Sequence, residues 1–339
     1  MAKKLKGVLI VNLGTPDSPK VADVRAYLRE FLMDERVIDI PFLQRWFLVN
    51  VIIATFRSPK SAKEYEKVWT EKGSPLLFHS VSLKEKLQES LGNEYIVSMG
   101  MRYQNPSIKE ALKAFEGKGL DELIVIPLFP QYASASTGSV AQKVMEEIKN
   151  ELVVPSVRFV EKFFDDELFI KTWVSIAKKY MEEEEYDHFL FSYHGLPERQ
   201  ILKASVGGCC QLGDCCNSYH SKNAYCYRAQ CFATTRLLTE ALNIPKEKHS
   251  ICFQSRLGKE EWIKPYIGTA MDELKEKKIK KVLAFSPAFV ADCFETNIEI
   301  GEEYRDQFLE NGGEKWQLVE SLNDNPLWVD CLVNMVKKV

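Results

Sequence analysis

The 339-residue sequence lacks several features that would define a membrane, nucleic-acid-binding or disordered protein. Its longest uncharged stretch near the N-terminus, 46–56, falls far short of the ~20 residues of a membrane-spanning helix. The 45 Lys and Arg residues face 48 Asp and Glu, a formal net charge of -3, so there is no basic excess and we expect no nucleic-acid partner. Aromatic residues make up 11% of the chain and long polar tracts are missing, which excludes disorder.

Secretion and nucleotide-binding signals are also missing. The apolar stretch 7–13 is short and no small-residue cleavage site follows it, so we interpret it as a first core strand. Neither a G-x-G-x-x-G nor a Walker-type loop occurs. Nine cysteines without a secretion signal indicate a reducing compartment, where clustered thiols bind metal more often than they form disulfides. We expect a cytoplasmic protein, with peripheral contact to the inner face of a membrane as the alternative.

What the sequence does contain is a regular alternation of short apolar runs and amphipathic stretches. The length predicts about two domains. Continuously apolar runs are typical of parallel strands that are covered on both faces. The predicted strands are 8–13, 95–98, 122–128, 157–159, 188–192, 250–253 and 281–285. The predicted helices are 109–115, 139–152, 168–183, 232–242 and 265–276. This alternation indicates an α/β fold.

The two halves of the chain are weakly similar. Three strand-and-turn segments recur in the same order: 8–16 with 188–197, 95–102 with 250–256, and 123–132 with 282–291. We therefore predict two similar Rossmann-like domains, each with a doubly wound parallel sheet, facing a central cleft. Domain 1–165 carries an apolar lip at about 31–56. Domain 166–339 carries a Cys-rich insertion at about 203–231 and a C-terminal helix.

His194 is the first candidate functional residue. It stands in Ser192-Tyr-His-Gly-Leu-Pro, where an apolar strand gives way to a loop, the usual place for a ligand site in an open α/β sheet. Gly195 and Pro197 allow a tight turn that exposes the imidazole. The alternative is a histidine that hydrogen-bonds its own turn, which is the commoner role of an isolated histidine.

A stripe of carboxylates forms the second candidate. Glu295, Glu299 and Glu303 recur every four residues and would line one helix face, with Asp292 one turn earlier. Like charges at this spacing destabilise a helix slightly, so the stripe needs a compensating reason. It is either a solvated surface or a track of oxygen ligands for a divalent cation or for protons.

The third candidate is a cluster of six cysteines in one Gly-rich stretch: Cys209, Cys210, Cys215, Cys216, Cys226 and Cys231. Their density predicts metal binding. The spacing does not follow the paired C-x2-C units common at zinc sites. A zinc site with His220 as a ligand, redox-active thiols and a [2Fe–2S] cluster on four of the six remain alternatives.

Weaker signals come from isolated cations and from the apolar lip. Arg57, Lys60, Arg102 and the Ser255-Arg256 pair are suited to binding ligand carboxylates, although single arginines more often form surface ion pairs. The lip is either a packed helix or a surface for a hydrophobic ligand or a membrane.

Taken together, these segments resemble ferrochelatases, which insert Fe²⁺ into a porphyrin at the end of haem synthesis. The likeness runs from Val8 to about Tyr304. It rests on the joint order of Asn12-Leu-Gly-Thr-Pro, Phe56-Arg-Ser-Pro-Lys, Gly73-Ser-Pro-Leu, Arg102-Tyr, Pro130-Gln-Tyr-Ala-Ser-Ala-Ser-Thr-Gly, Ser192-Tyr-His-Gly-Leu-Pro and Cys293-Phe-Glu-Thr. It implies a chelatase-like fold, with protoporphyrin IX and ferrous iron as substrates and protohaem as product.

The resemblance also implies roles for individual residues. His194 and Glu295 would be catalytic and contact Fe²⁺, and Asp292, Glu299 and Glu303 would form an acidic path for metal or protons. The implied porphyrin-binding residues are Leu13, Arg57, Lys60, Tyr65, Arg102, Tyr132, Ser255 and Trp262. The Cys-rich segment is similar to that of members with a [2Fe–2S] cluster, in which Cys231 is either one of the ligands or a pocket-side cysteine, so the four ligands are not assigned among the six.

Two positions depart from related patterns. Cys293 stands where the animal enzymes have a second histidine, and Leu13 stands where coproporphyrin-type members tend to have tyrosine, which favours protoporphyrin IX. The alternatives are a coproporphyrin or other-metal chelatase, and a non-catalytic Fe–S or haem-binding sensor on the same fold.

Overall fold

The computed structural model describes residues 5–256, 258 and 260–338, and the chain divides into two compact units. The first unit comprises Met1–Phe129, Ser134–Lys162 and Asn323–Val339, and the second comprises Pro130–Ala133 and Phe163–Leu322. The sequence-based division assigned the C-terminal helix to the second half, whereas here it belongs to the first unit. Asp324, just before that helix, pairs with Lys86, and Arg158 donates to the carbonyl oxygens of Met335 and Val336.

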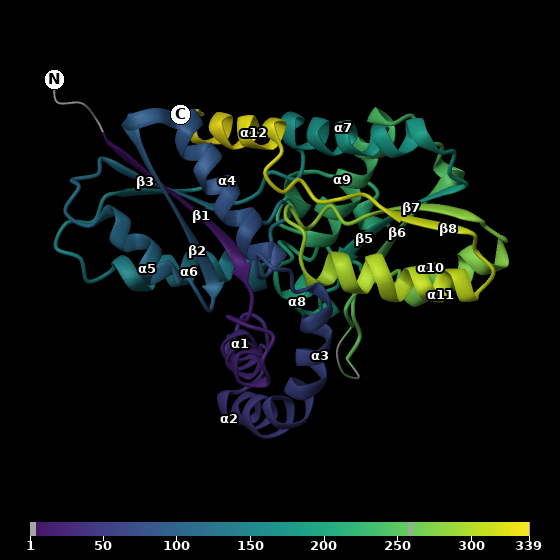
Figure 1. Ribbon diagram of the computed structural model, residues 1–339, viewed down its shortest axis with the longest axis horizontal. Helices are drawn as coiled ribbons and strands as arrows, with labels where there is room; N and C mark the ends of the chain where they lie inside the picture. Colours follow the sequence, from purple (N-terminus) through teal and green to yellow (C-terminus); the bar gives the residue numbers. More distant parts are fainter. Residues whose placement is uncertain (1–4, 257, 259, 339) are drawn as a thin grey trace. The chain divides into compact units, whose positions relative to one another are not determined.

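The first unit is built on a parallel sheet with helices on both faces (Figure 1). Its strands are β1 (Lys6–Gly14), β2 (Tyr95–Tyr103), β3 (Glu122–Pro127) and β4 (Ser156–Phe159), in the order β2-β1-β3-β4. Helices α5 (Ile108–Leu112) and α6 (Ser139–Ile148) cover one face, and α4 (Pro75–Leu91) and α12 (Pro326–Lys337) cover the other. Val8, Leu9, Ile10 and Val11 are fully buried because β1 is central and both of its faces are covered.

A helical segment follows β1 and completes this unit. It consists of α1 (Val21–Met33), α2 (Phe42–Phe47), the π-helix η1 (Leu48–Arg57) and α3 (Ser58–Val68). Its own small core includes Val24, Tyr27, Val49 and Ile53, so the segment is packed on its inner side. Short 3-10 turns at Gly92–Glu94 (η2) and Lys113–Phe115 (η3) and the π-helical turn η4 (Ser134–Gly138) connect the remaining elements.

The second unit repeats the same topology. Its strands are β5 (His188–His194), β6 (His249–Gln254), β7 (Lys281–Phe285) and β8 (Lys315–Leu318), in the order β6-β5-β7-β8. Each strand therefore has a counterpart in the first sheet, and the α/β fold with two similar parallel sheets is confirmed. The helices are α7 (Glu167–Glu183), α8 (Glu198–Lys203), α9 (Tyr227–Ala241), α10 (Ile267–Glu276) and α11 (Tyr304–Glu310). The 3-10 turns are η5 (Asp214–Cys216), η6 (Ser221–Asn223) and η7 (Lys246–Lys248).

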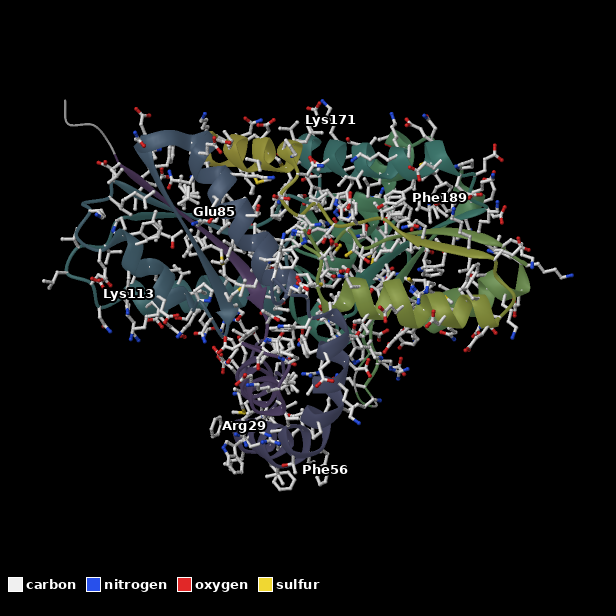
Figure 2. All side chains as sticks on the ribbon, viewed as in Figure 1. Arg29, Phe56, Glu85, Lys113, Lys171 and Phe189 are labelled. Carbon is white, nitrogen blue, oxygen red and sulfur yellow. The ribbon has the colours of Figure 1, made fainter. Side chains whose placement is uncertain are left out.

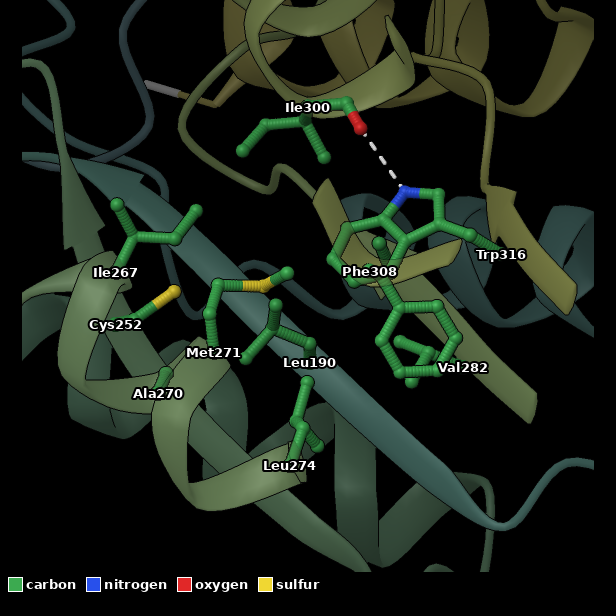
Figure 3. Packing of buried hydrophobic residues seen from close by; sticks show 11 residues of the cluster. Leu190, Cys252, Ile267, Ala270, Met271, Leu274, Val282, Ile300, Phe308 and Trp316 are labelled. Atoms are coloured by element: carbon green, nitrogen blue, oxygen red, sulfur yellow. Dashed lines mark hydrogen bonds between the residues drawn. The ribbon is translucent and has the colours of Figure 1, made fainter. Parts of the chain in front are cut away.

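The eighth strand is absent from the sequence-based prediction and matters for the site. β8 is short, and it places the indole of Trp316 against Phe308 with ring centroids 5.4 Å apart. The indole Nε1 donates to the carbonyl oxygen of Ile300 at 2.9 Å (Figure 3). Ile300 belongs to the π-helix η8 (Glu295–Glu303), which was predicted as an ordinary α-helical face. The cluster of Figure 3, which also includes Leu190, Met271 and Val282, thus fixes η8 against the sheet.

Candidate functional site

Three strands of the second sheet end at the same edge because they run parallel. His194 is the last residue of β5, and Gln254 is the last residue of β6. After β7 ends at Phe285, the chain reaches η8, whose first residue is Glu295. Carboxyl ends of parallel strands are the usual ligand-binding edge of an open α/β sheet. The predicted catalytic pair and the acidic stripe are therefore assembled at one edge of one unit.

The imidazole of His194 is held in an apolar environment. Burial lowers the pKa of His194 below 6.5, and the negative charge of Glu295 opposes this shift without reversing it. The ring of Phe289 meets the imidazole edge-on, with ring centroids 6.4 Å apart. A neutral imidazole at pH 7 can accept a proton or bind a metal ion. The prediction of a histidine that merely bonds its own turn has no counterpart in the hydrogen bonds of the described residues.

The turn after His194 is closely packed. The Gly195 N–H donates to the carbonyl oxygen of Gln254 at 2.8 Å, which joins the ends of β5 and β6. A Cβ atom at position 195 would lie 2.8 Å from that oxygen and 3.1 Å from the indole of Trp262. Glycine is therefore required here by close approach. Trp262, predicted as a pocket-wall aromatic, packs directly over the turn that carries His194.

The acidic stripe separates into inner and outer carboxylates. All three glutamates lie on the π-helix η8, in which hydrogen bonds run from i to i+5. Glu303 is exposed, whereas Glu299 is half-buried. Burial, with help from the charge of Glu295, raises the pKa of Glu299 to about 7, although hydrogen bonds from Ser255 and Gln254 oppose the rise. Glu299 therefore exchanges a proton readily near neutral pH.

Asp292 has a different surrounding from the other three. Its Oδ1 accepts a hydrogen bond from the Ser321 N–H at 2.9 Å, just after β8. The carboxylate thereby ties the segment before η8 to the loop that follows β8. The structure gives Asp292 an anchoring contact at the start of the stripe.

The other predicted porphyrin-binding residues fall into both units. In the second unit, the Tyr132 N–H is held by the Gln230 side chain at 2.7 Å and its ring meets Tyr225 edge-on. Ser255, expected to bind a propionate, donates instead to Glu299 Oε2 at 2.5 Å. In the first unit, Leu13 and Tyr65 are half-buried against the core of the helical segment.

The predicted cations of the first unit differ in accessibility. Arg57 and Lys60 are exposed, and neither makes an ion pair among the residues that the structure describes. Arg102 is bound to Asp34 at 2.6 Å and donates to Ser139 Oγ at 2.6 Å. Its guanidinium group also lies 4.5 Å from the ring centroid of Tyr103. Arg102 therefore has an internal partner, while Arg57 and Lys60 have their charges free for a ligand.

Asp34 is the centre of a polar network that the sequence did not indicate. Its Oδ2 accepts hydrogen bonds from Arg102, Tyr103 and Ser139. These contacts lower the pKa of Asp34 against the opposing effect of burial. The carboxylate therefore stays ionised and fixes the end of β2 to α6. Its partners lie 68 to 105 residues away in the sequence, too far for a spacing pattern to show.

The apolar lip is exposed on its outer side. Leu43 is 79% and Phe56 76% exposed, and Figure 2 shows the Phe56 ring pointing away from the ribbon. Phe42, Trp46, Phe47, Val51 and Ile52 are exposed on the same two elements, α2 and η1. Arg45, by contrast, is buried and donates to the carbonyl oxygens of Ile38 and Ile40. No helix of the described ranges is long and apolar enough to cross a membrane.

Five of the six clustered cysteines line one small pocket: Cys209, Cys210, Cys215, Cys216 and Cys226. A hydrogen bond between Cys216 and Cys226 lowers the pKa of Cys226 and raises that of Cys216. Cys231 is fully buried in α9 and does not line the pocket. Among residues 5–256, 258 and 260–338, no three or more His, Cys, Asp or Glu side chains are arranged to hold a metal ion. Thiols are the donors that soft metal ions prefer, but the five thiols of this pocket are not arranged to bind one metal ion together.

The cysteine segment is connected to His194 by one tyrosine. Tyr227 is the first residue of α9 and directly follows Cys226. Its hydroxyl donates to the main-chain oxygen of His194 at 2.9 Å. Neither Tyr227 nor Gln254 is predictable from the sequence as a functional residue, because each acts through a partner on another element. The only signal for Gln254 was its place in the repeated segment 250–256.

Comparisons with known proteins agree with this fold. The fold is similar to that of SirB from Bacillus subtilis, solved with Fe³⁺ (TM-score 0.53, 11% identity, 98% of this chain and 95% of that chain). It is also similar to DR2241 from Deinococcus radiodurans, described as structurally similar to chelatases (TM-score 0.50, 8% identity, 98% of this chain and 55% of that chain). The two α/β units, each with a four-stranded parallel sheet, thus have the chelatase fold.

The sequence comparisons are more specific. The ferrochelatase family model matches residues 5–339. The chain is 43% identical over 337 residues to the ferrochelatase of Coxiella burnetii (strain Dugway 5J108-111), covering 98% of this chain and 93% of that protein. It is 44% identical over 333 residues to that of Legionella pneumophila (strain Paris), covering 98% and 99%. The chain belongs to the ferrochelatase family, a family of lyases of haem biosynthesis.

Proposed function

We propose that this enzyme inserts Fe²⁺ into protoporphyrin IX and releases the two pyrrole protons, giving protohaem. The observation that carries the proposal is the half-buried imidazole of His194 beside the carboxylates of η8, all at the carboxyl edge of one parallel sheet. Metal insertion needs a neutral base on the porphyrin face and loosely binding oxygen ligands for the incoming ion. This edge supplies both.

In the proposed mechanism His194 accepts a pyrrole proton or holds the iron, and Glu295 is its acidic partner. The imidazole suits either role because its lowered pKa leaves it neutral at pH 7. Glu299, with a pKa of about 7, receives and releases protons one step further along η8. Glu303, exposed to solvent, is the outer end of the path. Asp292 supports the start of the path through its bond to Ser321.

The proposed porphyrin contacts follow the same logic. Exposed Arg57 and Lys60 bind propionates, because their charges are not already paired. Leu13, Tyr65, Tyr132 and Trp262 supply apolar and aromatic surface for the macrocycle. Arg102 acts through Asp34, and Ser255 through Glu299, so we assign these two to the surroundings of the site. The apolar residue at position 13 favours protoporphyrin over the more acidic coproporphyrin.

An anaerobic assay tests this function directly. Fe²⁺ is mixed with protoporphyrin IX or coproporphyrin, and the change from porphyrin to haem absorption is followed with and without the enzyme. We expect turnover of both iron and protoporphyrin, with a lower kcat/KM for coproporphyrin. Binding of porphyrin without metal insertion would instead identify a carrier or sensor, and preference for coproporphyrin would overturn the substrate assignment.

We also propose that the lip residues of α2 and η1 contact a membrane surface from one side. Seven large apolar side chains are exposed there, more than isolated surface residues would explain. Replacing both Leu43 and Phe56 by serine should weaken binding to vesicles of phosphatidylcholine and phosphatidylglycerol at least about tenfold, since each buried apolar side chain contributes ~1.5–3 kcal/mol.

Co-sedimentation with vesicles measures this effect, and Val153→Ser is the matched control. Val153 is 81% exposed in the same unit, outside α2 and η1. Equal binding of the wild type and the double variant would contradict membrane contact through the lip. Loss of binding in the control would show nonspecific adsorption instead.

We further propose that four of the five pocket cysteines hold a [2Fe–2S] cluster after a local rearrangement. The support is the number of thiols around one pocket and the S–H···S contact of Cys216 with Cys226. When bound, the cluster would add a redox-active iron centre beside α9. Of the cysteines that would hold it, Cys226 directly precedes Tyr227, whose hydroxyl donates to the main-chain oxygen of His194.

Metal analysis of protein purified without air tests the cysteine site. We expect iron and acid-labile sulfide in near-equal amounts, lost in Cys216→Ser and kept in Cys231→Ser. Cys231→Ser is the matched control because that thiol is buried outside the pocket. Zinc alone would replace the Fe–S assignment, and metal-free protein would contradict it.

A further inference from the structure

Gln254, the last residue of β6, is the most connected polar side chain at the site edge. It is 1% exposed. Its Oε1 accepts a hydrogen bond from Ser192 Oγ at 2.6 Å. Its Nε2 donates to Glu299 Oε2 at 2.9 Å and to the Glu295 carbonyl oxygen at 3.3 Å. One side chain therefore joins β5, β6 and the first turns of η8.

Only an amide of this length satisfies these partners together. A glutamine offers two donors and an acceptor on one rigid plane. Glutamate at position 254 would lose both donors and set a second negative charge against Glu299. A buried apolar side chain would leave the Ser192 hydroxyl and the Glu299 carboxylate without this partner, which is costly for a buried charge. Glutamine at position 254 is therefore required by its hydrogen bond to the Glu299 carboxylate on η8.

Ser255 reaches the same carboxylate because the backbone turns sharply there. Successive side chains of a strand point to opposite faces, so residues 254 and 255 should not share a partner. Ser255 has a φ of 65°, in the left-handed region that residues with a side chain seldom adopt. Its hydroxyl consequently donates to Glu299 Oε2 at 2.5 Å, the oxygen that also receives the Gln254 amide. Such local strain is typical of functional sites.

We propose that Gln254 and Ser255 form a carboxylate clamp whose task is to hold Glu299 in the position where η8 passes the ferrous ion or its displaced protons. The two are positioning residues, because they contact the acidic path and the main chain of Glu295. Their loss is expected to change the use of Fe²⁺ and to leave the binding of porphyrin unchanged. This inference rests on the proposed function. It adds the identity of the two residues that fix the inner end of the acidic path.

Two variants remove the clamp one residue at a time. Gln254→Met keeps the size of the side chain and deletes its hydrogen bonds. Ser255→Gly deletes the hydroxyl while glycine adopts the left-handed backbone without strain. We expect each to raise the KM for Fe²⁺ about tenfold, the usual strength of a hydrogen bond to a charged group. The KM for porphyrin should stay within about twofold, because neither side chain is assigned to the macrocycle.

A matched control separates positioning from general loss of structure. Gln88 in α4 also binds through both ends of its amide, to the Gly92 and Tyr95 carbonyl oxygens and the Val97 N–H, but belongs to the first unit. Gln88→Met should lower the melting temperature without changing either KM. If the clamp variants behave like this control, or if both KM values rise together, the clamp is overturned.

Crystal structures of the two clamp variants make the test independent of turnover. We expect the Glu299 carboxylate to move away from its position beside β6 in both, with the rest of η8 retained. An unmoved carboxylate would overturn the clamp even where activity falls. If the wild type fails to metallate any porphyrin, the proposed function is wrong. The position of the Glu299 carboxylate in the variants would still show whether Gln254 and Ser255 hold it in place.

Discussion

Replacing His194 by alanine should lower kcat at least about 100-fold while leaving porphyrin binding nearly unchanged. The variant removes the neutral imidazole at the end of β5, and loss of a general base typically costs 10²–10⁴-fold in rate. His194 uses only its main-chain oxygen in the bond from Tyr227, so that contact survives the change. Anaerobic initial rates and porphyrin fluorescence quenching measure the two quantities separately.

His249→Ala is the matched control for this variant. His249 lies at the amino end of β6, the opposite edge of the same sheet, where Nδ1 meets the Pro245 carbonyl oxygen at 3.0 Å. We expect turnover within about twofold of the wild type. Near-normal activity of His194→Ala would remove His194 from the mechanism, and a large loss in His249→Ala would point to instability of the sheet.

The sequence predicted the parts of this fold that local pattern determines. Continuous apolar runs marked seven strands, because covered parallel strands bury both faces. The order of the repeated segments anticipated that β5, β6 and β7 would be arranged as β1, β2 and β3 are. β8 was missed because its four residues, Lys315–Leu318, carry too short an apolar pattern. Its pairing with β7 comes from tertiary structure.

The candidate site was predictable to a similar degree. His194 and the η8 carboxylates stood out because their chemistry and their place after strands are visible in the sequence. The π-helical conformation of η8 could not be predicted, because a four-residue spacing is compatible with an α-helix as well. The partners of Arg102 and Ser255 were also hidden. Asp34 and Glu299 reach them only through the folded chain, and both bonds changed the role expected of the residue.

Glu295→Gln should reduce kcat by about the same two orders of magnitude as the loss of the histidine. The change keeps the size of the side chain but removes the negative charge that acts on both His194 and Glu299. Without that charge the pKa of His194 falls further, so its imidazolium form is less stable. The pKa of Glu299 falls as well, because a like charge no longer opposes its ionisation. Stopped-flow assays across a range of Fe²⁺ concentrations measure both kcat and the iron dependence.

Glu303→Gln gives the contrast that makes this result specific to the inner path. Glu303 lies on the same π-helix but is exposed, so water screens its charge and can replace it as a proton carrier. We expect less than about a fivefold loss there and an intermediate loss in Glu299→Gln. An unchanged iron dependence in Glu295→Gln would contradict the acidic path. Equal losses at 295 and 303 would show that net charge on η8 matters more than the place of each carboxylate along it.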